Sequence, residues 1–152
     1  MQGLKEYEPI TGAQVIEELH LLAQKMSGMS IQNINSTAVG GGVAEILNRM
    51  IPLFSELGVK ATWDVIKGGE KFFKVTKKFH NALHGKEEDI GAEDFVIFME
   101  NNELNLNRME LTGDVLFIHD PQPIGLINRK DFMKSKWIWR CHVDVSTPDE
   151  RV

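Results

Sequence analysis

Two polar residues, His119 and Asp120, end an apolar stretch in a way that predicts a ligand site. The stretch Val115-Leu116-Phe117-Ile118 is typical of a strand buried on both faces, and the prolines of Pro121-Gln122-Pro123 prevent it from continuing. At a strand end, a histidine is able to exchange a proton, and an aspartate is able to bind a sugar hydroxyl. We predict catalytic roles for His119 and Asp120; the alternative is a structural histidine beside an aspartate that caps a loop.

Three consecutive glycines, Gly40-Gly41-Gly42, lie between a predicted strand at 30–35 and a helical pattern that begins at Val43. Glycine lets a ligand approach the backbone closely, and the free N–H groups at the start of the following helix suit a phosphate or an oxyanion. The triplet lacks the Gly-Lys-Ser/Thr ending of a P-loop and the spacing of a dinucleotide fingerprint. A tight strand-to-helix turn without a ligand is the alternative.

A third polar set, Arg140, His142 and Asp144, alternates with apolar residues near the end of the chain. The alternation from Trp137 to Val145 predicts a strand at 137–145 with the polar set on one face. Polar side chains are unusual on a strand that is covered on both faces. His142 and Asp144 lie nearest the predicted carboxyl end, and we predict that both bind substrate; the alternative is an edge strand with a solvated face.

His80 and His84 lie one turn apart on a predicted helix, a spacing that a metal ion is able to use. His80 is not followed by the glutamate of a zincin motif, and no third ligand is evident. The single cysteine, Cys141, has no second cysteine for a metal knuckle or an internal disulfide. We therefore predict neither a metal site nor a cofactor.

Predicted strands alternate with predicted helices along the chain. Thr11 and Gln14 form a capping box for the first helix, and Pro52 removes a hydrogen bond from the second. Periodicity and glycine stops predict helices at 12–27, 43–57, 70–84 and 92–107, strands at 30–35, 59–65, 114–118 and 137–145, and a short helix before the last strand. This order predicts an α/β, Rossmann-like domain of three layers, with a mostly parallel sheet covered on both sides.

The three sets of polar residues share a position relative to the predicted strands. The glycine triplet, His119-Asp120 and His142 each follow, or lie near, the carboxyl end of a strand. In a parallel sheet these ends form one edge, where open α/β sheets bind ligands at the point of strand-order reversal. We therefore expect the three sets to meet at one edge of the sheet.

The composition limits the classes of protein to which the chain can belong. A chain of 152 residues with 42% hydrophobic and 26% charged residues predicts one globular domain over 1–152. Its formal charge of −5 predicts no binding to nucleic acid or to an anionic membrane. No signal peptide is evident at the N-terminus, and we expect a cytoplasmic protein. A helix start at Thr147-Pro148-Asp149-Glu150, just before the chain stops, predicts truncation from a longer protein.

Four segments of the sequence resemble, in the same order, segments of one enzyme family. They are residues 35–47, which include the glycine triplet, and residues 79–83, 119–123 and 139–144. The family is that of the glycosyltransferring trehalose synthases, which are retaining, nucleotide-sugar-dependent glycosyltransferases of the two-domain GT-B fold. Residues 85–112 show no obvious match.

The resemblance implies the N-terminal half of a GT-B fold, which holds the acceptor while glucose passes from a nucleotide diphosphate glucose to glucose, giving trehalose, or in reverse. By position, the resemblance implies that Gly41 and Gly42 lie near the donor phosphates. It also implies that Asp120 and His142 bind sugar hydroxyls and that His119 lines the cleft. The resemblance also implies, as a partner, a C-terminal domain that carries most nucleotide contacts, so the isolated chain is expected to be inactive.

Two other interpretations of the sequence are open. One is a non-catalytic module that binds a nucleotide or an anion through the glycine triplet alone. The other is an interaction domain that forms a homodimer through exposed apolar surface.

Overall fold

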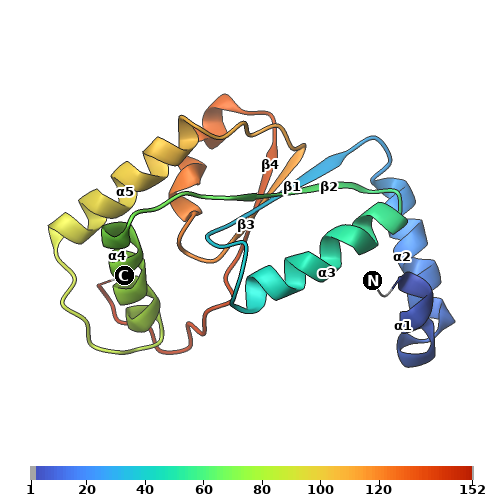
Figure 1. Ribbon diagram of the computed structural model, residues 1–152, viewed down its shortest axis with the longest axis horizontal. Helices are drawn as coiled ribbons and strands as arrows, with labels where there is room; N and C mark the ends of the chain where they lie inside the picture. The colour runs from blue at the N-terminus through green and yellow to red at the C-terminus, as the bar shows by residue number, and fades with distance from the viewer. Residues whose placement is uncertain (1–2, 152) are drawn as a thin grey trace.

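The computed structural model of the chain describes residues 3–151. Its elements, in chain order, are α1 (Leu4–Thr11), α2 (Ala13–Lys25), β1 (Ser30–Asn35), α3 (Gly42–Glu56), β2 (Lys60–Val65), α4 (Glu70–Leu83), α5 (Ala92–Leu106), β3 (Val115–His119), the 3-10 helix η1 (Ile124–Phe132) and β4 (Lys136–Arg140). Figure 1 shows the strands in the middle of the molecule, with α1, α2 and α3 toward one end and α4 and α5 toward the other.

The strands of the described residues form one parallel sheet in the order β2-β1-β3-β4. β1 is central: Asn35 is in register with Val65 of β2, and Ile34 is in register with Ile118 of β3. The chain builds outward from β1 to β2 and then crosses to the other side for β3 and β4. The strand order therefore reverses between β1 and β3, and the prediction of a Rossmann-like α/β domain with a parallel sheet is confirmed.

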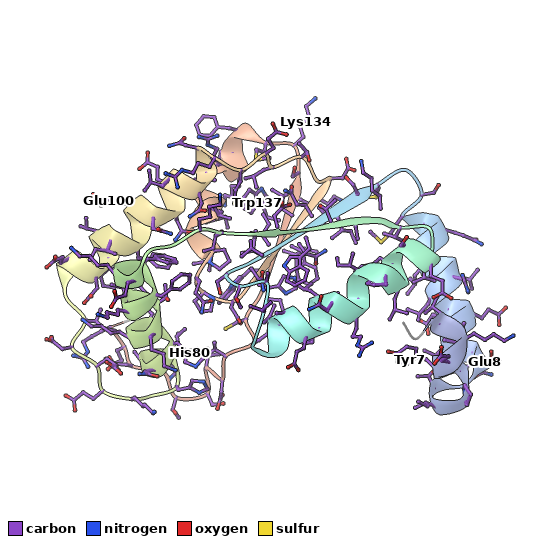
Figure 2. All side chains as sticks on the ribbon, in the orientation of Figure 1. Tyr7, Glu8, His80, Glu100, Lys134 and Trp137 are labelled. Atoms are coloured by element: carbon purple, nitrogen blue, oxygen red, sulfur yellow. The ribbon has the colours of Figure 1, made fainter. Side chains whose placement is uncertain are left out.

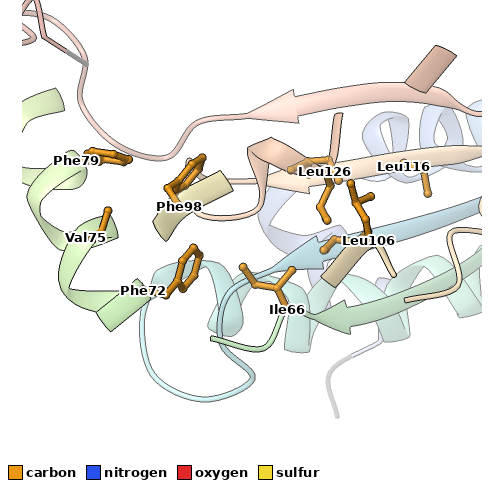
Figure 3. Packing of buried hydrophobic residues seen from close by; sticks show 10 residues of the cluster. Ile66, Phe72, Val75, Phe79, Phe98, Leu106, Leu116 and Leu126 are labelled. Carbon is orange, nitrogen blue, oxygen red and sulfur yellow. The ribbon is translucent and has the colours of Figure 1, made fainter. Parts of the chain in front are cut away.

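Two apolar clusters lie on opposite faces of the sheet, because successive side chains of a strand point to opposite faces. On one face, Ile31, Val59 and Val115 pack with Phe54 of α3 and with Met26, which follows α2. The larger cluster lies on the other face, under α4, α5 and η1 (Figure 3), and consists of Ile34, Ile66, Phe72, Val75, Phe79, Phe98, Leu106, Leu116, Ile118 and Leu126. Helices thus cover both faces, which gives the three predicted layers.

Most of the predicted elements lie close to their expected bounds. β1, α3, β2, α4, α5 and β3 are all present where hydrophobic periodicity predicts them. Gly58 and Gly85, with φ of 75° and 79°, follow α3 and α4 as the expected stops. No helix among residues 3–151 is long and apolar enough to cross a membrane.

The N-terminal region differs from the prediction of a single helix at 12–27. Thr11 is the last residue of an additional helix, α1, and its Oγ1 donates to the Tyr7 carbonyl at 3.1 Å, so the predicted capping box is wrong. Gly12, with φ of 85°, separates α1 from α2. Pro9 lies inside α1, and because proline disfavours the interior of a helix, the sequence does not predict a helix here. Tertiary contact explains its formation, because Leu4 N donates to Glu56 Oε2 at 2.9 Å.

The last strand is shorter than the predicted strand at 137–145. β4 ends at Arg140, so Arg140, His142 and Asp144 do not share one strand face, and that prediction is wrong. The reason lies at the end of β3, where Asp120 takes a left-handed conformation with φ of 65°. Its Oδ1 accepts a hydrogen bond from His142 N at 2.7 Å, and this bond replaces a further sheet contact.

Residues 141–149 then pack beside α4. Asp149 N donates to the Ala82 carbonyl at 2.9 Å, and a Cβ added at Gly85 would lie 2.5 Å from the Thr147 carbonyl oxygen. A turn at 150–151 stands where the sequence predicts a helix start, and the Asp149 carboxylate binds the Arg151 guanidinium. The segment after β4 is therefore held at the carboxyl edge of the sheet, next to the C-terminal end of α4.

Candidate functional site

The glycine triplet follows the carboxyl end of the central strand and is held there by Asn35. Asn35 Nδ2 donates to the Thr37 carbonyl at 2.8 Å, and its Oδ1 accepts a hydrogen bond from Trp63 Nε1 of β2, also at 2.8 Å. Gly40 and Gly41 then take φ of 72° and 83°, the left-handed region that favours glycine. The turn is therefore fixed in shape by its neighbours as well as by its glycines.

The backbone of this turn is open to the surroundings. A Cβ added at Gly40, Gly41 or Gly42 would meet no atom within 4 Å. Gly42 is the first residue of α3, whose initial N–H groups lack helical partners. A broad groove of about 890 Å³ continues along the helix, with Glu45 and Arg49 among its lining residues. The arrangement can accept an anion at the helix start, with one acidic and one basic side chain nearby.

His119, the last residue of β3, is fully buried, with an exposed fraction of 0%. Its Nε2 lies 3.2 Å from Asn33 Oδ1 of β1, its Nδ1 lies 3.2 Å from His142 Nε2, and its ring stacks on Phe117. Burial, followed by the charges of His142 and Arg140, lowers the pKa of His119 to about 4. The ring is therefore neutral at neutral pH, and both nitrogens are engaged by protein groups.

Asp120 forms the corner at which β3 ends. Its backbone N donates to the Arg140 carbonyl at 2.9 Å, and its own carbonyl accepts a hydrogen bond from Trp139 Nε1 at 3.0 Å. Its Oδ1 accepts the hydrogen bond from His142 N. Three contacts from β4 and the following segment thus hold one half-buried aspartate in its left-handed conformation, with Oδ2 as the remaining carboxylate oxygen.

His142 is half-buried and lies directly against His119. The centroids of the two rings are 5.5 Å apart, with a tilt of 31° between the planes. The preceding residue, Cys141, is also half-buried, and its Sγ lies 3.6 Å from the Val143 carbonyl oxygen. Because His142 is held both through its backbone N and through its ring, its position depends on Asp120 and on His119 together.

Asp144 lies in a different environment from the other predicted residues. It is exposed, and its Oδ1 accepts hydrogen bonds from Ser146 N at 2.9 Å and Ser146 Oγ at 2.6 Å. These bonds lower the pKa of the Asp144 carboxyl group, and the charge of His84 on α4 adds a smaller effect. Asp144 therefore stabilises its own loop beside α4.

A second group of polar residues faces the same edge from α4. Figure 2 shows His80 near the C-terminal end of α4, beside the segment that follows β4. Partial burial lowers the pKa of His80, the charges of Lys77 and His84 act in the same direction, and the charge of Asp120 opposes them. A cavity of about 300 Å³ lies here, lined by His80, Lys77, Thr76, Phe73 and Gln122.

The structure thus brings together most, but not all, of the residues predicted from the sequence. The glycine turn follows β1, and His119 and Asp120 end the adjacent strand β3, so both lie at the reversal of strand order. His142 joins them from the segment after β4, although not through a longer strand. Asp144 contacts Ser146 instead and lies near His84.

Sequence reasoning missed Asn33 and Asn35, although a signal for them was present. The central strand reads Ser-Ile-Gln-Asn-Ile-Asn, and its amides at 32, 33 and 35 are buried with exposed fractions of 4%, 0% and 2%. Amides on a strand of a parallel sheet must find hydrogen-bond partners, because an unpaired buried polar group costs free energy. Their partners, however, depend on the strand register, which the sequence does not reveal.

Among residues 3–151, no group of three or more His, Cys, Asp and Glu side chains is arranged to hold a metal ion. His80 and His84 lie with ring centroids 4.8 Å apart in an edge-to-face arrangement.

Comparison with known proteins identifies the family of the chain. Residues 33–152 match the family model of the N-terminal domain of trehalose synthase. The chain belongs to this family. The matched range begins in β1 and includes every candidate site residue, whereas α1 and α2 precede it. The resemblance predicted from the sequence is confirmed.

Individual relatives agree with the family match. The trehalose synthase of Pyrococcus horikoshii is 41% identical over 148 residues, which cover 96% of this chain and 35% of that protein. The trehalose synthase of Rubrobacter xylanophilus is 38% identical over 156 residues, which cover 99% of this chain and 38% of that protein. The trehalose phosphorylase of Pleurotus pulmonarius is 28% identical over 164 residues, with shares of 95% and 22%. The chain spans about a third of the length of these trehalose synthases.

Proposed function

We propose that the chain is the acceptor-side domain of a retaining glycosyltransferase that makes trehalose. In the proposed reaction, the bond between glucose and the diphosphate of a nucleotide diphosphate glucose breaks. A new glycosidic bond forms to the anomeric oxygen of a second glucose, and the hydroxyl proton of the acceptor leaves with the nucleoside diphosphate; the reverse reaction is equally allowed. The observation that carries the proposal is membership in the trehalose synthase N-terminal domain family.

The range of relatives supports a sugar role for this part of the molecule. Relatives named trehalose synthase and relatives named trehalose phosphorylase both align along nearly the whole chain, at 41% and 28% identity in two examples. Their names share trehalose but denote different reactions. A domain common to both is therefore best assigned to the sugar that both names contain.

The acceptor would bind between Asp120, His142 and the cavity beside α4. Asp120 Oδ2 is the carboxylate oxygen left for a sugar hydroxyl, because Oδ1 holds His142 N. His142 offers its ring Nδ1, because Nε2 faces His119. The neighbouring cavity of about 300 Å³ offers His80 and Lys77 as further polar contacts and Phe73 as an apolar wall for a sugar ring. We propose this position for the accepting glucose.

The glycine turn would face the donor. α3 begins at Gly42, and the N–H groups of its first turn have no helical partners. An anion in front of this helix N-terminus would accept hydrogen bonds from them. A departing diphosphate gains negative charge in the transition state, and fixed backbone dipoles stabilise such charge without reorganisation. Gly41 and Gly42 would allow the diphosphate to approach the backbone, since no side chain blocks it.

His119 would act through His142 rather than on the sugar. Its exposed fraction is 0%, and its pKa of about 4 leaves it neutral at neutral pH. A group of this kind does not donate a proton to a leaving group under these conditions. We propose that it supports the side chain that contacts the sugar.

The remaining machinery would come from a C-terminal domain. The chain spans 35% of the length of the Pyrococcus horikoshii enzyme, so most of the corresponding protein has no counterpart here. We propose that such a domain supplies the nucleotide contacts, and that the chain alone holds the acceptor weakly. Because the proposed donor is a nucleotide sugar from inside the cell, we propose that the protein is cytoplasmic.

A second candidate is a non-catalytic module that binds a nucleotide or another anion. The open backbone of the glycine turn and Arg49 in the adjoining groove favour it. In this case Asp120 and His142 would serve only to shape the end of the sheet. Strong binding of a nucleoside diphosphate without any response to glucose or trehalose would support this candidate.

A backbone NMR titration of the chain with glucose, trehalose and ADP- or UDP-glucose tests the proposal. We expect glucose and trehalose to shift the amides of residues 120 and 142, and the nucleotide sugars to shift residues 40–42 as well. Asp120→Asn should weaken the sugar response. Asp114→Asn is the matched control, because Asp114 binds Ser30 near the amino ends of β1 and β3. A folded chain that responds to none of these sugars would contradict the proposed function.

A further inference from the structure

Asn33 lies in the middle of the central strand and is fully buried. Its Nδ2 donates to the Thr62 carbonyl of β2 at 3.1 Å, and its Oδ1 lies 3.2 Å from His119 Nε2. A backbone carbonyl only accepts hydrogen bonds, so the amide nitrogen of Asn33 must be the atom that faces Thr62. The amide therefore presents its oxygen to His119.

The orientation of Asn33 determines which nitrogen of His119 carries the proton. An amide oxygen only accepts, so Nε2 of His119 must be the protonated nitrogen. Burial keeps the His119 ring neutral, because its pKa is lowered to about 4. Nδ1 of His119 consequently holds a lone pair, and it faces His142 Nε2 at 3.2 Å. His142 must then donate from Nε2.

We infer that Asn33 and His119 are positioning residues that hold the neutral form of His142 as the Nε2–H tautomer, with its Nδ1 lone pair free to accept a hydrogen bond from a substrate hydroxyl. The hydrogen-bond chain itself depends only on the contacts described above. The identification of the hydroxyl as that of a sugar rests on the proposed function. Asp120 fixes the backbone of His142 at the same time, through the 2.7 Å bond from His142 N.

The chain of hydrogen bonds runs in one direction, from His142 through His119 and Asn33 to the Thr62 carbonyl. The Thr62 carbonyl at its end only accepts hydrogen bonds, so no proton is transferred along this chain of hydrogen bonds. A proton that His142 accepts from a substrate therefore enters at Nδ1 and leaves by the same nitrogen. The substrate atom opposite Nδ1 of neutral His142 must be a hydrogen-bond donor, which selects a hydroxyl over an ether oxygen or a fluorine.

Long-range ¹H–¹⁵N NMR of the chain labelled with ¹⁵N-histidine, at slightly alkaline pH, reads out the tautomers directly. We expect His119 and His142 each to show a protonated Nε2 and an unprotonated Nδ1. A protonated Nδ1 on neutral His119, or on neutral His142, would overturn the inference. This measurement needs neither a ligand nor a variant, so it stands even if the substitutions below prevent folding.

Asn33→Leu removes the oxygen that holds the proton on His119 Nε2 at little change in size. We expect His119 to move toward the Nδ1–H tautomer, His142 to follow, and the affinity for glucose to fall by about fivefold to tenfold. Gln32→Met is the matched control, because Gln32 is a buried amide of the same strand that bonds to Asp64, Thr112 and the Glu110 carbonyl instead. The control should lose stability and keep both tautomers; tautomer changes of equal size in both variants would overturn the inference.

Titration with glucose and with deoxyfluoro glucoses separates this inference from the proposed function. A fluorine in place of the hydroxyl that faces His142 should abolish the shift of the His142 Nδ1 resonance, while fluorines elsewhere on the ring leave it. The expected tautomers without any response to sugars would support the hydrogen-bond chain and contradict the proposed function. Sugar binding by a chain in which His142 carries its proton on Nδ1 would do the reverse.

Discussion

His119 is an ionisable side chain with no exposed surface, so protonating it in the folded chain costs free energy. Burial and the neighbouring charges lower its pKa from 6.5 to about 4. Between these values the unfolded chain binds more protons than the folded chain, because the unfolded histidine titrates near its ordinary pKa. The free energy of unfolding is therefore unaffected above this window and decreases as the pH falls through it.

We expect His119 to reduce the free energy of unfolding by up to about 3 kcal/mol as the pH falls from neutral to about 4. Urea denaturation at neutral pH and at mildly acidic pH gives the free energy of unfolding of the wild type and of His119→Gln. The effect is the difference between the two proteins in the slope of this free energy against pH. His20→Gln, on the exposed surface of α2, is the control and should keep the wild-type slope. Equal slopes for wild type and His119→Gln would contradict the prediction.

Gly42 separates the requirements of the fold from those of a ligand. A Cβ at this position meets no atom within 4 Å, and Gly42 is the first residue of α3. We expect Gly42→Ala to leave the free energy of unfolding unchanged or to raise it by about 0.5 kcal/mol, because alanine favours the helix. We also expect about tenfold weaker binding of a nucleotide sugar, because the methyl group would occupy the position that we propose for the diphosphate.

Thermal unfolding and an NMR titration with UDP-glucose measure the two effects. Gly91→Ala is the matched control, because Gly91 lies at the start of α5 and its Cβ would also be unobstructed. Unchanged affinity in Gly42→Ala would show that no ligand approaches this turn.

At the scale of elements, sequence patterns predict those parts of the fold that local chemistry decides. The apolar residues of α4 repeat with the helical period, β3 is a continuous apolar run, and Gly58 and Gly85 end helices by their positive φ. Local chemistry does not decide the extent of β4. Its alternation continues to Val145 in the sequence, but the carboxylate of Asp120 binds His142 N and ends the strand at Arg140.

The candidate site likewise has parts that the sequence predicts and a part that it does not predict. The glycine turn and His119-Asp120 are predictable because each lies at the carboxyl end of a strand whose position the sequence reveals. The link from Asn33 to His119 is not predictable, because it joins β1 to β3 across 86 residues of sequence and depends on their register. Contacts between residues so far apart in the sequence form only when the sheet is assembled.

The corner at Asp120 should determine how β4 ends. Asp120→Ala removes the acceptor for His142 N and places a residue without a local hydrogen bond in the left-handed region, φ 65°. We expect a loss of about 2 kcal/mol in the free energy of unfolding and faster amide hydrogen exchange at residues 141–149. Asp120→Asn keeps an acceptor oxygen and tolerates this conformation, so it should lose much less stability. Equal stability losses in the two variants would contradict this account of the corner.

At the scale of the whole molecule, the candidate site lies at an edge and has protein on one side. The glycine turn, Asp120 and His142 lie at the carboxyl ends of the strands, and the grooves beside them are open. Trehalose synthases that match the chain are about three times its length. We therefore expect the chain, given glucose and UDP- or ADP-glucose, to form no trehalose above background.

Chromatographic detection of trehalose tests this expectation, with the trehalose synthase of Pyrococcus horikoshii as the positive control. Sugar binding without turnover would fit a domain that holds the acceptor alone. Sustained trehalose formation by the chain would contradict the need for a second domain.

Cys141 gives the chain a single thiol beside the candidate site. It is the single cysteine of the sequence, it is half-buried, and it precedes His142 in the segment that Asp149 holds against α4. A thiol-reactive dye therefore attaches at one place without any engineered residue, at the edge where a ligand is expected. The rate at which the dye attaches reports how often residues 141–149 lift away from α4. A lower rate in the presence of a sugar would show that the sugar holds this segment against α4.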